Sequence, residues 1–167
     1  SAGFVVADVR TLDKQQSSYR QVTADSAAKQ DLVISAYKPL AAFEQRFIAE
    51  GGSLNGAWDF IQQHLEQLPL PTLREGVIEK QDERQAYLLY DRMVAFHIRH
   101  SLAVPLSAPE FYQGLRQRCS EVDGMYFTPA QAGDYHKCRQ QAQRVEQLAL
   151  FVTDEKSALQ WLHRELD

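Results

Sequence analysis

The chain has 167 residues, a formal net charge of −4 at pH 7 and two cysteines. The negative balance argues against a dedicated nucleic-acid clamp, because phosphate binding usually leaves a basic footprint. Cys119 and Cys138 are too few for a disulfide framework and indicate free thiols in a reducing compartment. No apolar run approaches the roughly 20 residues that cross a bilayer, so we expect a cytoplasmic protein that does not enter a membrane.

The first predicted elements are two short apolar segments. Residues 3–9 follow Ser1-Ala2 without an initiator methionine, which predicts that the chain is a piece of a larger protein. Residues 31–39 form the second segment, and both are rich in β-branched residues, as strands are. Neither alternates cleanly between apolar and polar residues, which is typical of a sheet covered on both faces.

These segments carry a resemblance to a known family. Gly3–Gln15, with Thr11–Gln15 at its end, and Gln30–Pro39 resemble the last hairpin of the catalytic domain of large bacterial DNA methylases similar to adenine-specific DNA methyltransferases. Pro105–Tyr112 and Asp123–Phe127 are similar to the tail that follows that domain. The likeness extends over nearly the whole chain, but its distinctive part is the first 39 residues.

The resemblance implies that residues 3–38 are the final two strands of a doubly wound sheet that binds S-adenosylmethionine elsewhere. The family's catalytic element needs two adjacent prolines, and none of the six prolines here is adjacent to another. Its cofactor loop needs closely spaced glycines after a strand. The only adjacent pair, Gly51-Gly52, lies between two helical patterns. We therefore assign no catalytic, cofactor-binding or metal-binding residue to this chain.

Beyond Pro39 the apolar period changes from two to about 3.6, which predicts helices. The first covers Leu40–Glu50, the second follows Ser53 as a suitable N-cap, and the longest covers Asp82–His100. The residues expected to face the core are, helix by helix, Leu40, Phe43, Phe47 and Ile48; Leu54, Trp58, Ile61, Leu65 and Leu68; and Tyr87, Tyr90, Val94, Ala95 and Ile98.

Capping signals mark two further helices. Ser107 with Glu110 predicts a capping box for a helix to Cys119, and Thr128 with Gln131 predicts another, with Pro129 in its first turn. The remaining predicted elements are a strand at Leu102–Leu106, a turn at Glu121–Gly124, strands at Met125–Phe127 and Leu148–Val152, and a helix at Asp154–Leu166.

Two constellations suggest chemistry, and each has a plainer interpretation. His97 and His100 share a helix, and His136 lies near Cys138, which suggests a two-helix metal site; surface histidines are the plainer interpretation. Cys119 as a nucleophile competes with Cys119 as a packing residue at a helix end. We favour the plainer interpretation in both cases.

Nucleic-acid contact is the stronger candidate. Basic residues end one predicted helix and continue on the next, with a short strand between them, an order that could build a winged-helix-like reader. The plainer interpretation is that these charges keep two exterior helix faces soluble. The candidate DNA-contact residues are Arg116, Arg118, Lys137, Arg139 and Arg144.

We therefore expect an α+β chain: a β-hairpin over 1–39 left from a methyltransferase sheet, and a mostly helical domain with short strands over 40–167. By itself it should not be an enzyme. Its parent would methylate DNA adenine with S-adenosylmethionine, and this portion would support that domain or contact DNA. The alternative is a protein-interaction module of a restriction or phage-defence assembly. Exposed strand edges also predict self-association through residues 3–38.

Overall fold

A computed structural model describes residues 3–13, 30–74 and 76–145, and every structural statement below refers to these residues. They form a mixed α+β structure that divides into two compact units. The first unit comprises Ser1–Pro69 and Gln81–Thr128, and the second comprises Leu70–Lys80 and Pro129–Asp167. The boundary predicted between residues 39 and 40 falls inside the first unit.

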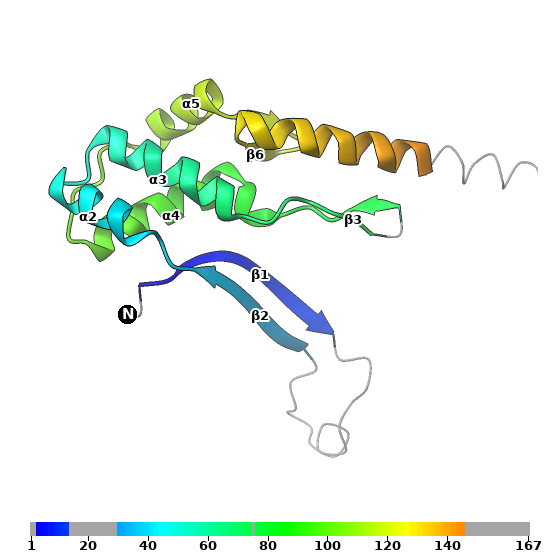
Figure 1. Cartoon of the computed structure of the whole chain (residues 1–167), viewed down its shortest axis with the longest axis horizontal. Helices are drawn as coiled ribbons and strands as arrows, with labels where there is room; N and C mark the ends of the chain where they lie inside the picture. The colour runs from blue at the N-terminus through cyan, green and yellow to red at the C-terminus, as the bar shows by residue number, and fades with distance from the viewer. Residues whose placement is uncertain (1–2, 14–29, 75, 146–167) are drawn as a thin grey trace, which may run out of the picture. The chain divides into compact units, whose positions relative to one another are not determined.

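A long antiparallel hairpin of β1 (Val5–Asp13) and β2 (Gln30–Tyr37) opens the first unit. Figure 1 shows it extending away from the helices as a two-stranded ribbon. The pairing is regular except for a bulge at Ala7, between the pairs Val6–Ala36 and Asp8–Ser35. The predicted strands are thus confirmed.

Helices α2 (Ala41–Ala49) and α3 (Leu54–Gln67) follow the hairpin. The predicted N-cap is confirmed, because the Ser53 hydroxyl accepts a hydrogen bond from the Gly56 amide at 3.1 Å. The predicted apolar stripes were partly wrong: Leu40, Ile48 and Leu54 are 73%, 48% and 46% exposed. Leu40 is the N-cap of α2 and Leu54 is the first residue of α3, so both lie at a helix end.

The next helix is shorter than predicted, and the residues predicted to face the core were only partly right. A 3₁₀ turn, η1 (Asp82–Arg84), precedes α4 (Ala86–Arg99), and Gln85 between them is extended. Tyr87, Ala95 and Ile98 are exposed, whereas Tyr90 and Val94 are half-buried. The stripe that faces the core is displaced around the helix and consists of Leu89, Met93, Phe96 and His97.

Aromatic rings fill the centre of the first unit. Phe96 lies 4.4 Å from Phe60 and 4.8 Å from Phe47, measured between ring centroids, so it joins α4 to both α3 and α2. All three side chains are buried. Burying a side chain of this size stabilises a fold by about 1.5–3 kcal/mol, so this cluster anchors the three helices.

The first unit ends with α5 (Ala108–Arg118) and a tight hairpin of β5 (Ser120–Val122) and β6 (Met125–Phe127). The predicted capping box is confirmed, and Ser107 donates from its amide to Glu110 at 2.8 Å. Asp123 and Gly124 both have positive φ, as a two-residue hairpin turn requires.

One expectation for this region differs from the structure. Residues 102–106 form no strand, because the chain leaves α4 through Ser101 at φ 57° and continues irregularly to α5. All three residues of β6 are buried, and the winged-helix-like arrangement stays a prediction.

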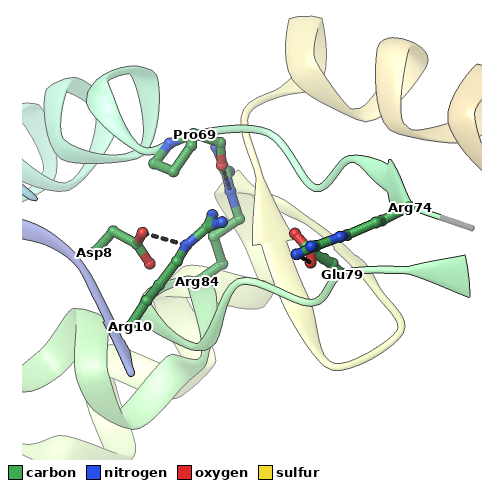
Figure 2. Close-up of polar contacts among 6 residues, drawn as sticks. All are labelled: Asp8, Arg10, Pro69, Arg74, Glu79 and Arg84. Carbon is green, nitrogen blue, oxygen red and sulfur yellow. Dashed lines mark hydrogen bonds and ion pairs between the residues drawn. The ribbon is translucent and has the colours of Figure 1, made fainter. Parts of the chain in front are cut away.

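The second unit contains the small hairpin of β3 (Leu73–Arg74) and β4 (Val77–Ile78) and a helix over residues 129–145. The predicted helix start at Pro129 is confirmed. Arg74 and Glu79 form an ion pair at 3.3 Å beside the small hairpin (Figure 2). The strand predicted at Leu148–Val152 and the helix predicted at Asp154–Leu166 lie outside the described residues. Within the described ranges, no helix has the length and apolar character to span a bilayer.

A buried arginine completes the end of α3. Pro69 cannot donate a backbone hydrogen bond, so the Leu65 carbonyl lacks its usual helical partner. Arg84, which is fully buried, donates to the carbonyls of Leu65 and Leu68 at 3.2 and 2.8 Å, and to that of Pro69 at 3.1 Å (Figure 2). A third guanidinium nitrogen donates to Tyr126 at 3.1 Å. Burial lowers the pKa of Arg84 to about 10, so it remains a cation at neutral pH beside the negative end of the helix dipole.

Candidate docking surface on the hairpin

The β1–β2 hairpin has two chemically different faces. Opposite residues of an antiparallel pair share a face, and the face alternates along each strand. The pairing therefore places Val6, Val9, Leu32, Ile34 and Ala36 together on one face, called here the outer face. The opposite, inner face carries Val5, Asp8, Arg10, Val33, Ser35 and Tyr37.

The bulge at Ala7 determines this arrangement. Without it, strict alternation along β1 would place Val5, Ala7 and Val9 on one face and Asp8 and Arg10 on the other. The extra residue shifts the phase, so that Val9 turns to the outer face and Arg10 to the inner face. Val5 and Ala7 remain buried at 5% exposure each, whereas Val9 is 44% exposed.

Near its base, the inner face is fixed to the helices by two polar contacts. The Tyr37 hydroxyl lies 3.0 Å from Nδ1 of His64 on α3, and Arg99 of α4 donates to the Phe4 carbonyl at 2.6 Å. His64 is fully buried, and this burial, with smaller contributions from Arg92 and Arg84, lowers its pKa to about 3. His64 is therefore neutral at physiological pH. Burial also raises the pKa of the Tyr37 hydroxyl, which stays protonated.

A charged pair occupies the inner face beyond the bulge. Arg10 donates to Asp8 at 2.6 Å (Figure 2). With its amide nitrogen turned towards Asp8, the buried Gln81 donates to Asp8 at 3.3 Å and accepts from Arg10 at 2.7 Å. The inner face thus meets η1 through complementary polar groups.

The outer face carries apolar side chains that no described residue covers. Val9, Leu32 and Ile34 are 44%, 60% and 57% exposed, and Val33 on the inner face is 46% exposed. Single exposed apolar residues are ordinary, but a contiguous group on one strand face is typical of a surface that another element covers. This outer face is the strongest candidate interaction site among the described residues.

Arg118, one of the two predicted DNA-contact residues on α5, packs against α3. The Arg118 guanidinium lies 4.5 Å from the centre of the Trp58 ring and donates to the Gly114 carbonyl at 3.4 Å. A Cβ atom on Gly114 would lie 2.4 Å from a Trp58 ring atom, so α3 and α5 meet closely here. Arg116, in the same turn as Arg118, is exposed.

The other three predicted residues lie on the helix of the second unit. Lys137 is exposed and forms an ion pair with Asp134 at 2.9 Å; this hydrogen bond raises the pKa of Lys137. Arg139 is half-buried and Arg144 is exposed. The five predicted residues are therefore divided between the two units, two on α5 and three on the helix over 129–145.

An open pocket of about 770 Å³ lies where α2, α3 and α5 meet, and its polar groups are largely occupied with one another. Arg46 pairs with Asp59 at 3.4 Å, and Ser53 donates to Glu50 at 3.3 Å. Trp58 in its wall packs against Arg118 and stacks on Phe111. The lining residues of this pocket are thus explained by contacts with one another, and we assign no ligand to it.

His97, His100 and Cys119 have contacts that explain them without chemistry. His97 is fully buried, contrary to the surface position expected for it, and its Nδ1 lies 2.8 Å from the Met93 carbonyl. His100 lies 3.2 Å from a Glu44 carboxylate oxygen. Burial raises the pKa of the Cys119 thiol, which disfavours a nucleophilic thiolate. No group of three metal-ligating side chains occurs among the residues that the structure describes.

Sequence reasoning missed the residues that fix the hairpin and the end of α3. Gln81, Arg84 and His64 act through partners distant in sequence, so local patterns do not reveal them. One signal was available: a proline directly after a helix predicts a carbonyl that needs another donor.

Comparisons with known proteins identified no matching family model, no matching curated protein and no matching solved structure.

Proposed function

We propose that this chain is the C-terminal, non-catalytic portion of an S-adenosylmethionine-dependent DNA adenine methyltransferase-like protein, in which the β1–β2 hairpin attaches the helices to the catalytic sheet. The uncovered outer face of the hairpin carries the proposal. The resemblance of residues 3–39 to the last hairpin of that domain supplies the identity of the sheet.

The energetics favour attachment through this face. Completely burying an aliphatic side chain yields about 1.5–3 kcal/mol, and Val9, Leu32 and Ile34 are each roughly half exposed. Covering all three would therefore contribute about 3 kcal/mol. The inner face is already held near its base by Tyr37 and Arg99, so the helices would follow the hairpin when it docks.

In this proposal, the catalytic and cofactor residues belong to the rest of the parent protein, which acts on DNA in the cytoplasm. The portion described here supports that domain, and the exposed Arg116 and Arg144 are its candidates for phosphate contact. Self-association through residues 3–38 would use the same uncovered surface when no catalytic sheet is present.

The supporting role predicts a defect confined to the outer face. In the longer protein, the double substitution Leu32→Asp and Ile34→Asp should lower the yield of folded, S-adenosylmethionine-binding protein at least tenfold. Val77→Asp is the matched control, because Val77 is 68% exposed on β4 of the second unit. Equal yields from the double variant and the control would refute attachment through this face.

The non-catalytic assignment has its own test. The isolated 167-residue chain should show no saturable binding of S-adenosylmethionine by calorimetry and no transfer of a labelled methyl group to duplex DNA. Saturable binding at micromolar concentration would contradict the assignment. If the outer face is instead covered by a separate protein, the chain belongs to the alternative class, an interaction module of a restriction or phage-defence assembly.

A further inference from the structure

The two edges of the β1–β2 hairpin are protected to different degrees. Natural sheets protect exposed edges with charges, prolines, bulges or covering elements. β1 carries the bulge at Ala7 and the charges of Asp8 and Arg10, and it contacts η1 and α4. From Leu32 to Ala36, β2 has no charge, proline or bulge, no element in the described ranges covers it, and every residue is exposed.

We propose that the edge of β2 pairs antiparallel with β2 of a second copy of this chain, about a two-fold axis at Ile34. In this register Ile34 faces Ile34 of the other copy, Leu32 faces Ala36, and Val33 faces Ser35. A large side chain thus faces a small one at both flanking positions, and no charges oppose each other. The pairing uses the edge of β2 and not the outer face, and it does not depend on the methylase assignment.

The symmetry is compatible with the rest of the first unit. Opposite residues of an antiparallel pair share a face, so the outer faces of the two hairpins would join into one apolar surface on a four-stranded sheet. The helices lie near the Tyr37 end of β2. Because the strands run in opposite directions, the two sets of helices would lie at opposite ends of the new sheet.

The short edge predicts a weak dimer. Five paired residues extend about 16 Å and would bury roughly 300–400 Å² on each copy, against about 800 Å² per partner for a standard stable interface. Main-chain hydrogen bonds between strands supply the specificity of such strand addition. We expect a dissociation constant between about 10 μM and 1 mM.

The first test is sedimentation velocity of the full chain from about 10 μM to 1 mM, with residue-resolved amide exchange at both ends of this range. The expected result is a monomer at the low end and a dimer at the high end. The amides gaining protection at high concentration should be alternate residues between Leu32 and Ala36, because only every second amide points away from β1.

Charge reversal at the axis tests the register. Ile34→Lys and Ile34→Glu each place like charges opposite each other in a homodimer, so each variant alone should dimerise at least tenfold more weakly. An equimolar mixture should regain association severalfold, because opposite charges then meet. Ile34 is 57% exposed, so both variants should retain the circular dichroism of the parent chain.

Val9→Lys is the matched control: Val9 lies on the same outer face but on β1, away from the proposed interface, and is 44% exposed. It should leave the dissociation constant unchanged within about twofold. A chain that remains monomeric at 1 mM, an equal loss in Val9→Lys and Ile34→Lys, or a mixture without recovery would overturn the pairing. None of these results bears on the double Asp variant in the longer protein, so failure here is distinguishable from failure of the proposed function.

Discussion

Replacing Arg84 with methionine tests how much the end of α3 depends on one side chain. Methionine retains much of the buried volume but donates to none of the four carbonyls that Arg84 binds, those of Leu65, Leu68, Pro69 and Tyr126. The bonds to Leu68 and Tyr126 are buried, and a buried carbonyl left without a donor costs about 1–3 kcal/mol, which gives about 4 kcal/mol for the two. Methionine also removes the desolvation cost of the buried cation, which offsets part of this destabilisation. We therefore expect the free energy of unfolding to fall by about 3 kcal/mol.

Urea unfolding measures the loss, with Trp58 fluorescence as the probe in a background that carries Trp161→Phe. Arg84→Lys retains the charge but lacks the planar fork of donors, so it should lie between the parent and Arg84→Met. Arg46→Met is the matched control, because Arg46 is exposed and makes one long ion pair; it should cost less than about 0.5 kcal/mol. A loss below about 1 kcal/mol for Arg84→Met would refute the reasoning.

Three further predictions concern pH, packing and DNA. The folded chain keeps His64 neutral down to about pH 3 while the unfolded chain protonates it near pH 6.5, so stability should fall as pH decreases through this window. Its contribution to the slope approaches about 1.4 kcal/mol per pH unit below pH 6.5, and His64→Gln should remove it in urea titrations at pH 7, 6 and 5; an unchanged slope would contradict it. Gly114→Ala would place a Cβ 2.4 Å from the indole packed against it and should destabilise by about 1 kcal/mol in thermal unfolding, despite better helix propensity. Gly133→Ala, with open space around its Cβ, should be neutral or stabilising, and equal effects would argue against the packing explanation. If the chain binds DNA, neutralising Arg116 and Arg144 together should weaken binding to all DNA sequences about equally. In anisotropy titrations, the dependence of log K on log salt concentration should become less steep by roughly one unit per lost phosphate contact. Unchanged binding would place the site elsewhere.

Local chemistry made some elements predictable. Ser53 and the Ser107–Glu110 pair act within one turn of their helices, and Asp123-Gly124 supplies the positive φ values of its turn from two adjacent residues. Such features depend on neighbours in sequence, so they can be predicted without knowledge of the tertiary structure.

The orientation of the other side chains depends on tertiary contacts with residues distant in sequence, which sequence patterns do not reveal. Local patterns along β1 do not reveal that Arg10 lies on the inner face, because the bulge at Ala7 shifts the phase of the strand and because the partner Gln81 lies 71 positions later. On α4, Tyr87 and Ile98 are as apolar as the residues that were buried. Only the positions of Phe47 and Phe60 determine that Phe96 faces the core. The outer face could not be recognised as uncovered until the pairing register was known.

The Arg84 contacts have a consequence for the order in which the chain folds. α3 can form its early turns as soon as its own residues are available. The carbonyls at its end lack their hydrogen bonds until Arg84, 15–19 residues later in the sequence, has been added. That donor in turn completes its contacts only when Tyr126, 42 residues further on, arrives with β6. During synthesis the end of α3 should therefore stay frayed until the β5–β6 hairpin has emerged from the ribosome. A nascent chain halted before Tyr126 should show protected amides in the first turns of α3 and rapid exchange in the last.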